Sequence, residues 1–171
     1  MEKVSSACLL DESNLLIASS HFLYLVEQNE RELISAQFFE QIITHIHSFK
    51  KSYVVCTDMK FLIIFNEGNN IKEKTKLSEP GDIQDIKMLE DCIIVAVGNS
   101  ILFFKKHGNE YFQKEAKKIK LENSFPINIG IISDTKKFLV ITQDQNMYKI
   151  NSEMKEKGSL STAKELYCSE I

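Results

Sequence analysis

Hydrophobic and polar residues alternate along this chain in short blocks that repeat. Residues 92–105 read CIIVAVGNSILFFK, two apolar runs joined by a Gly-Asn-Ser turn. Runs rich in β-branched and aromatic residues on both sides of such a turn predict a tight β-hairpin. The same pattern occurs in NLLIASSHFLYLVE at 14–27, YVVCTDMKFLIIFN at 53–66 and FLVITQDQNMYKIN at 138–151. The pattern therefore predicts four copies of one hairpin.

The copies are regularly spaced. The first apolar runs lie 39, 39 and 46 residues apart, measured at Leu15, Val54, Ile93 and Leu139. The second runs show the same spacings at Leu23, Leu62, Ile101 and Met147. This agreement predicts that the hairpins superpose without a gap and that the extra residues lie between the third and fourth. A period near 40 is typical of four-stranded propeller blades, and the apolar residues lack the three- and four-residue intervals of a helix.

The expected fold is all-β and β-propeller-like, with about four four-stranded antiparallel blades in a partial or small propeller. We expect a single domain over residues 1–171, with units at approximately 4–39, 41–81, 83–124 and 125–162. The extra residues fall within 111–121, where a longer strand pair and one helical turn both remain open. The alternative fold is a generic antiparallel sandwich or barrel of about 16 short strands.

The repeat resembles the WD-repeat family of β-propellers, whose second and third strands correspond to these hairpins. Where that family often has Trp-Asp, this chain has Phe65-Asn66 and Phe104-Lys105; it contains no Trp, and no unit opens on Gly-His. The resemblance covers residues 4–162 and points to a divergent member. It implies a non-catalytic scaffold that mediates protein–protein interaction within an intracellular complex.

Four units raise the question of how the propeller closes. Propellers usually close with about four to eight blades, and closure removes the exposed sheet edges. An open arc leaves an apolar blade face at each end, which a soluble monomer rarely tolerates. We expect an arc that is completed by further blades from a protein partner, a second copy or a longer parent chain. A ring closed at four blades is the alternative.

Composition narrows the classes of partner. The 171 residues include 43% hydrophobic and 26% charged residues, with a formal net charge of −3. No whole-molecule field therefore attracts nucleic acid or an anionic membrane. No apolar run reaches the roughly 20 residues of a membrane helix, and the N-terminal stretch is too acidic for a secretory signal. The cysteines, Cys8, Cys56, Cys92 and Cys168, show no CxxC spacing, which favours reduced thiols and an intracellular location in cytoplasm or nucleus.

Candidate catalytic and metal-binding residues are few. His45 and His47 form an HxH pair that shares one strand face, a pattern that can begin a zinc site, but no third ligand is apparent. Asp58 and Asp144 lie in hairpin turns, where a capping role is commoner than a catalytic one. No hydrolase, metalloprotease or P-loop motif occurs. We predict no catalytic residues, no metal, no cofactor and no enzymatic activity.

A protein-binding face is the main functional hypothesis. The loops that join one unit to the next and the tips of the central hairpins are expected to form it. We predict Phe39, Pro80, Asp82 and Phe125 as contact residues, because apolar or rigid groups on exposed loops make good contacts. Residues 114–120 (KEAKKIK) are interrupted by a glutamate and favour a solvated outer strand over an RNA-binding stripe.

The alternative function is an accessory, non-catalytic subunit of an RNA-modifying enzyme such as a tRNA guanosine methyltransferase. Residues 101–150 are similar to a segment of the WD-repeat subunit that supports that enzyme. The matching positions are Lys117, Lys118, Pro126, Ile129, Ile131, Asp134, Tyr148 and Ile150. That family has a Lys-Ser-Gly-Asp-type turn before the tyrosine, whereas this chain has QDQN at 143–146. The resemblance implies a separate catalytic partner and at most indirect RNA contact. An enzyme that uses the central channel is least favoured, because the inner strands are mainly Ile, Leu and Val.

Overall fold

The computed structural model describes residues 3–90, 92–105, 117–121, 124–132, 137–145, 147–151 and 161–162. Every regular element in these residues is a β-strand, and the strands form four antiparallel sheets of four strands, each in chain order. We call the sheets blades 1 to 4. The all-β class and the four-stranded blades predicted from the sequence are confirmed.

The strands follow one another without interruption by any helix in the described residues. Blade 1 consists of β1 (Val4–Leu9), β2 (Asn14–Ser19), β3 (Phe22–Glu27) and β4 (Glu32–Phe38). Blade 2 consists of β5 (Ile43–Phe49), β6 (Ser52–Thr57), β7 (Phe61–Phe65) and β8 (Ile71–Lys76). Blade 3 consists of β9 (Ile83–Met88), β10 (Cys92–Val97), β11 (Ser100–Lys105) and β12 (Lys117–Lys120). Blade 4 consists of β13 (Pro126–Ile132), β14 (Lys137–Thr142), β15 (Met147–Asn151) and β16 (Ser161–Thr162).

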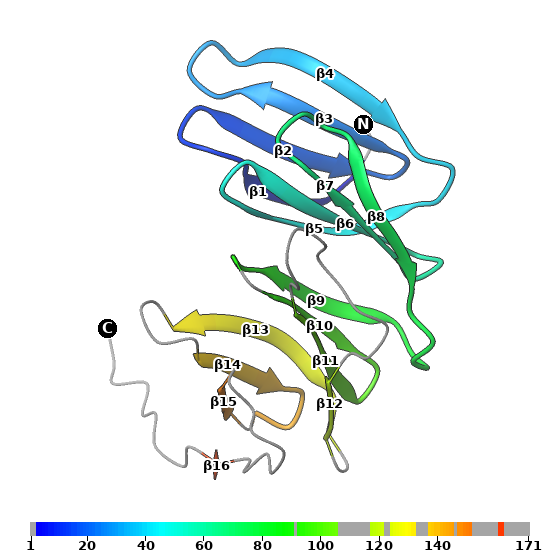
Figure 1. Ribbon diagram of the computed structural model, residues 1–171, viewed down its shortest axis with the longest axis vertical. Coiled ribbons are helices and arrows are strands. Elements are labelled where there is room, and N and C mark those ends of the chain that lie inside the picture. The colour runs from blue at the N-terminus through cyan, green and yellow to red at the C-terminus, as the bar shows by residue number, and fades with distance from the viewer. Residues whose placement is uncertain are drawn as a thin grey trace.

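The blades stack in series, from blade 1 at the top of Figure 1 to blade 4 at the bottom. The first strand of each blade packs against the first strand of the next, so that β1, β5, β9 and β13 are the inner strands of a propeller. Within the described part of the chain, β1 and β13 do not pack together in this way. The four blades therefore form an open arc.

A hydrophobic core fills each of the three spaces between blades. Successive residues of a strand point to opposite faces of its sheet, so a blade in the middle of the arc buries side chains on both sides. Representative core residues are Leu16 and Phe65 between blades 1 and 2, Val54 and Ile93 between blades 2 and 3, and Ile94 and Phe138 between blades 3 and 4. This two-sided burial explains why β6 and β10 are apolar at almost every position.

The turns between the second and third strands differ in length. Blades 1 and 3 have two-residue turns, which begin at Ser20 (φ 52°) and Gly98 (φ 53°). Blades 2 and 4 have one residue more in this turn, and its last residue, Lys60 (φ 61°) or Gln145 (φ 63°), is left-handed. Both lengths are common in hairpins.

This difference corrects the predicted superposition of the hairpins. Counted from the third strands, the equivalent residues of the second strands are Leu15, Tyr53, Ile93 and Phe138. The prediction that placed Val54 and Leu139 there is wrong by one residue. A shift of one residue matters because it moves a side chain to the opposite face of the sheet. The four segments themselves do occupy matching places, as β2, β6, β10 and β14.

Some predicted features lie outside the described residues. They include residues 111–116 of the segment 111–121, where the extra length of unit 3 was expected, and most of 154–162, of which only β16 is described. In the described ranges, Cys8, Cys56 and Cys92 form no disulfide bond, and no helix is long and apolar enough to cross a membrane.

Candidate functional site

One end of the arc gathers the connections between blades and the turns between second and third strands. We call this end the loop face. It comprises the connections 39–42 and 77–82, residues 121, 124 and 125 of the third connection, and the turns 20–21, 58–60, 98–99 and 143–145. The connections from β4 to β5 and from β8 to β9 are visible on the right of Figure 1.

Backbone hydrogen bonds hold each connection against a neighbouring turn. The N–H···O distances are 2.7 Å from Ile43 to Ser20, 2.9 Å from Asp58 to Ile42, 3.1 Å from Gly98 to Asp82, 2.8 Å from Leu121 to Asn99 and 2.8 Å from Gln143 to Phe125. These bonds satisfy backbone groups that a loop would otherwise leave to water. The loop face is therefore a fixed surface that spans all four blades.

The connection between blades 2 and 3 lies directly on the hairpin turn of blade 3. A Cβ atom at Gly98 would stand 2.3 Å from the carbonyl oxygen of Pro80, and one at Gly81 would stand 2.6 Å from the Cα of Gly98. Both glycines have positive φ, 53° and 89°, a region that other residues rarely adopt. Lys60 Nζ also donates to the carbonyl oxygen of Glu79 at 2.6 Å. Pro80 is therefore held in one position on the loop face.

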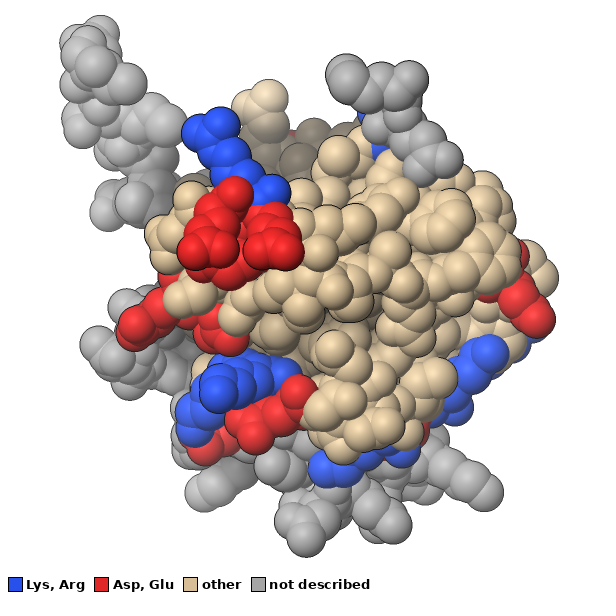
Figure 2. Space-filling view, turned by 90° about the horizontal axis from the view of Figure 1, so that it is seen from above, with Lys and Arg blue, Asp and Glu red and all other residues tan. Residues whose placement is uncertain are grey.

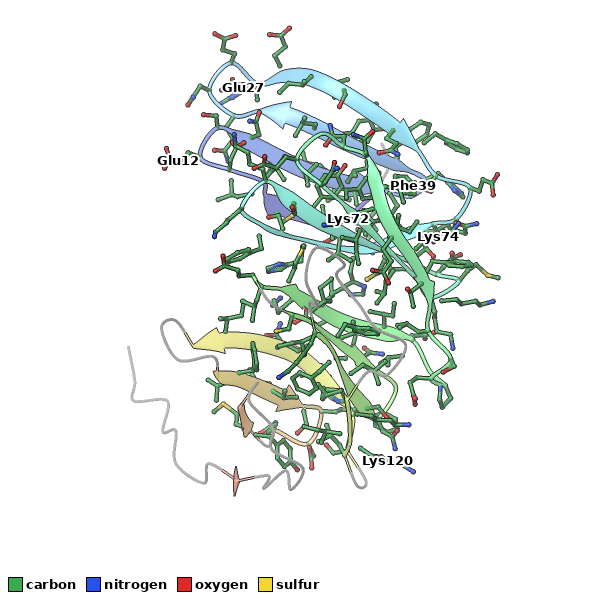
Figure 3. All side chains as sticks on the ribbon, in the orientation of Figure 1. Glu12, Glu27, Phe39, Lys72, Lys74 and Lys120 are labelled. Carbon is green, nitrogen blue, oxygen red and sulfur yellow. The ribbon has the colours of Figure 1, made fainter. Side chains whose placement is uncertain are left out.

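The four residues predicted to contact a partner divide into two groups. Pro80, Asp82 and Phe125 are exposed on the loop face, Phe125 at 53%. Phe39, labelled in Figure 3, is only 6% exposed and packs edge-on to Phe65 in the core between blades 1 and 2, with ring centroids 6.1 Å apart. Its side chain is therefore not available to a partner. The binding role of the other three stays a prediction.

Sequence reasoning missed two exposed apolar residues of the loop face. Ile42 is 42% exposed and Met59 is 53% exposed. They lie close together, because the backbone N–H of Asp58 donates to the carbonyl oxygen of Ile42. A signal for Met59 was present, since it is an apolar residue in the middle of a polar hairpin turn. Ile42 gave no such signal, because it continues into the apolar start of β5.

The inner strands share a β-bulge. The pairing with the second strand skips one residue between Val4 and Ser6, Ile43 and His45, Ile83 and Asp85, and Pro126 and Asn128. A bulge bends the strand and redirects its side chains. The residue after the bulge is polar in every blade, namely Ser6, His45, Asp85 and Asn128. The inner strands are thus more polar than the sequence-based description of them allowed.

Polar side chains of the inner strands join consecutive blades. Ser6 Oγ accepts from the backbone N–H of Ile46 at 3.2 Å, joining blades 1 and 2. Asp85 Oδ2 accepts from the backbone N–H of Ile129 at 2.7 Å, joining blades 3 and 4. In both cases the donor directly follows the post-bulge residue of the next blade. The post-bulge position therefore acts as a repeated hydrogen-bond link between neighbours.

His47 of the HxH pair belongs to this structural network. His47 Nδ1 accepts from the backbone N–H of Met88 at 3.1 Å, which joins blades 2 and 3. His45 Nδ1 is buried and has no hydrogen-bond partner among the described residues, because the equivalent donor, the backbone N–H of Ile86, donates to Asp85 Oδ1 at 2.7 Å. No group of three or more potential ligands that would hold a metal occurs in the described part of the chain.

Burial sets the protonation of both histidines. Desolvation lowers the pKa of His45, with Asp85 and the backbone of Gln84 opposing. Desolvation also lowers the pKa of His47 to about 4, with the charge of Lys87 acting in the same direction and Asp85 against it. Both rings are therefore neutral at pH 7, which His47 requires in order to accept a hydrogen bond at Nδ1.

Acid is expected to weaken the link between blades 2 and 3. Unfolded His47, with an ordinary pKa of 6.5, binds a proton between pH 6.5 and 4, whereas the folded ring, with a pKa of about 4, does not. The free energy of unfolding must therefore fall as the pH falls through this window. The expected decrease is on the order of 2 kcal/mol between pH 8 and pH 5. Urea unfolding at both values measures it. The His47→Gln variant keeps an acceptor oxygen and should lose this part of the pH dependence; equal pH dependence in the two proteins contradicts the assignment.

Asp58 accepts a hydrogen bond within its own turn, whereas Asp144 accepts one from the end of β14 and one from the connection between blades 3 and 4. Asp58 Oδ1 accepts from the backbone N–H of Met59 at 2.8 Å. Asp144 Oδ1 accepts from Ser124 Oγ and Thr142 Oγ1, both at 2.5 Å. These contacts correspond to the capping role that the sequence favoured over a catalytic one.

Comparison with known proteins agrees with this architecture. No family model and no curated protein sequence matches the chain. Among solved structures, Hsv2 of Kluyveromyces lactis matches at 13% identity and a TM-score of 0.65, over 92% of this chain and 50% of that one. The Pan2 WD40 domain of Neurospora crassa matches at 10% identity and 0.72, over 89% and 50%. A structure of U3-55K matches at 7% identity and 0.72, over 87% and 49%.

These matches establish the fold of the chain and the share of a propeller that it spans. The chain has the fold of a WD40 β-propeller, and its resemblance to the WD-repeat family is confirmed at the level of the fold. It spans about half the length of the proteins that it matches. The four blades are accordingly a partial propeller.

Proposed function

We propose that this chain is a non-catalytic scaffold that binds a protein partner through its loop face, within an intracellular complex. The observation that carries the proposal is a set of exposed apolar side chains on a fixed surface. Ile42, Met59 and Phe125 are 42%, 53% and 53% exposed on loops that backbone hydrogen bonds hold in place. Apolar anchors on rigid loops lose little conformational freedom when a partner covers them, which favours tight binding.

The fold class supports the same proposal. WD40 propellers are typically non-catalytic scaffolds that bind other proteins. In this chain Ser6, His47 and Asp85 of the inner strands, where a catalytic channel would lie, are engaged in links between blades. The exposed apolar residues lie at the loop face instead.

Co-purification with matched variants tests the proposal. The chain would be isolated from its native source with bound proteins retained, and the partner then titrated against Met59→Ser and Phe125→Ser variants. Each variant is expected to weaken binding at least tenfold, because it removes an apolar anchor. Ile71→Ser is the control, since Ile71 is 57% exposed but lies on the outer strand β8. Equal weakening by all three variants, or by none, would contradict a role for the loop face.

The accessory subunit of an RNA-modifying enzyme remains a narrower hypothesis within the same class. Two of its matching positions add little support: Lys118 Nζ forms an ion pair with Glu79 at 2.6 Å, and Asp134 lies outside the described residues. The same purification distinguishes the two, because this hypothesis requires a methyltransferase among the bound proteins.

A further inference from the structure

One face of blade 1 is covered by blade 2, and the other face is open. On the open face, Leu9, Leu15, Val26 and Leu33 pair across all four strands to form a continuous apolar row. A second row runs beside it through Ile17 and Tyr24. Leu9 and Leu33 are 56% and 55% exposed. Apolar rows of this extent on a monomer usually mark an interaction surface.

The view from the blade 1 end agrees with this pattern. Figure 2 shows a broad area without charged side chains and acidic side chains gathered along one side. Figure 3 places Glu12 and Glu27 at the end of blade 1 opposite to Phe39, Glu12 in a turn and Glu27 at the end of β3. The open face of blade 1 is therefore separate from the loop face and from the acidic turns.

Every later blade buries the equivalent face against the blade before it. The positions of Leu15 and Ile17 correspond to Tyr53 and Val55 in blade 2 (2% and 0% exposed), to Ile93 and Val95 in blade 3 (both 0%) and to Phe138 and Val140 in blade 4 (both 0%). The open face of blade 1 thus has the position and the residue types of an inter-blade contact that lacks its preceding blade.

Blade 4 offers the matching surface at the other end of the arc. By register, Leu139, Ile141 and Met147 share the face that points away from blade 3. Their equivalents in blade 3, Ile94, Ala96 and Ile101, are fully buried against blade 4. No described element of the chain packs on this face of blade 4. It is the kind of surface that each blade turns toward its successor.

The hydrogen-bond link between blades also has its two halves at the two ends. Asn128 occupies the post-bulge position of Ser6 and Asp85, whose side chains accept from the next blade. Ala7 directly follows Ser6, and its backbone N–H therefore corresponds to the donors on Ile46 and Ile129. Asn128 Oδ1 of one arc and Ala7 N–H of another would repeat the link already seen within the chain.

We propose that two copies of this chain join head to tail, with blade 4 of each docked on the open face of blade 1 of the other. Two arcs of four blades give a ring of eight, within the range of about four to eight in which propellers close. The chain covers 49–50% of the propeller chains cited above, and a second copy would double the number of blades. The two contacts are related by a two-fold axis, which closes the assembly without an uncovered blade face at either end of an arc. The loop face stays accessible in this ring.

The mass in solution and a complementation experiment test this arrangement. The wild-type chain is expected at twice 19.7 kDa by light scattering or native mass spectrometry. A Leu9→Asp/Leu33→Asp variant blocks blade 1, and an Ile141→Asp variant blocks blade 4; each alone should be a monomer. A mixture of the two should form a heterodimer, because one intact blade 4 can dock on one intact blade 1. Ile71→Asp, on the exposed outer strand, should leave the dimer unchanged.

Each outcome decides the proposal. The proposal is overturned if the wild-type chain is a monomer in solution, or if it binds a different protein in place of a second copy. A dimer that persists in the Ile141→Asp variant shows a contact of blade 1 with blade 1 and also overturns it.

Circular dichroism confirms that the variants are folded. If the Ile141→Asp variant is not folded, the Asn128→Ala variant replaces it. That change keeps the apolar face, removes one hydrogen bond from each of the two contacts and should raise the dimer dissociation constant about 30-fold; an unchanged constant contradicts the link. Loss of partner binding in the loop-face variants with the dimer retained separates this proposal from the proposed function.

Discussion

Replacing Phe65 by alanine is expected to lower the free energy of unfolding by about 4 kcal/mol, within the range of about 3–5 kcal/mol for a fully buried phenylalanine. The Phe65 side chain is 0% exposed in the core between blades 1 and 2. Its ring stacks on Tyr53 with centroids 4.6 Å apart and meets the edge of Phe39. Neither neighbour can move into the space, because Phe39 begins a connection that backbone hydrogen bonds fix. The cavity therefore persists and adds to the lost transfer free energy.

Urea unfolding of Phe65→Ala and Ile71→Ala measures this effect with a matched control. Phe65 and Ile71 pair directly across β7 and β8, so both variants have the same strand environment. Ile71 is 57% exposed, and its replacement should cost less than about 1 kcal/mol. A loss below about 1.5 kcal/mol for Phe65→Ala, or similar losses for the two variants, would contradict the described core.

The sequence predicted the hairpins and their number because inter-blade packing leaves a strong imprint. A blade with both faces buried requires apolar residues at nearly every position of its middle strands, and β6 and β10 show this. The register of the second strands relative to the third strands was harder to predict from the sequence. Turns of two and three residues are equally polar, so the extra residue in blades 2 and 4 left no mark on the pattern of hydrophobicity. The error placed Val54 on the face opposite to its true one.

Which side chains of the loop face are buried and which are exposed could be predicted only in part. Phe38 and Phe39 are adjacent, and one of them must point into the core and the other toward solvent. The structure buries Phe39 at 6% and exposes Phe38 at 63%, and the sequence alone gives no reason to choose between them. Pro80 was easier, because it lies in a loop with the polar residues Ser78, Glu79 and Asp82.

The polar links of the inner strands could not be predicted from local pattern. Their donors lie about 40 residues away along the chain, on the next blade. His45 and His47 therefore suggested metal chemistry, since an HxH pair on one strand is a familiar local motif. Only the packing of β5 against β9 shows that His47 is an acceptor for the neighbouring backbone.

Replacing Asp85 by alanine is expected to lower the free energy of unfolding by about 3 kcal/mol. The Asp85 side chain is 12% exposed, and its carboxylate accepts from the backbone N–H groups of Ile86 and Ile129, each at 2.7 Å, and from Lys87 Nζ at 3.0 Å. Alanine supplies no acceptor, so the N–H of Ile129 loses its partner at the junction of blades 3 and 4. Lys87 loses its counter-charge at a site where its side chain is only 22% exposed.

The Asp85→Asn variant separates the hydrogen bonds from the charge. Asparagine keeps one acceptor oxygen at nearly the same place, so it should retain the bond to Ile129 and cost about half as much as alanine. Urea unfolding measures both losses, and hydrogen exchange at the Ile129 amide reports the link itself. We expect this amide to exchange faster in Asp85→Ala and to stay protected in Asp85→Asn. Equal exchange rates in the wild type and in Asp85→Ala would show that Asp85 does not join the two blades, and the same test would then remove the basis for expecting Asn128 to bind a further blade.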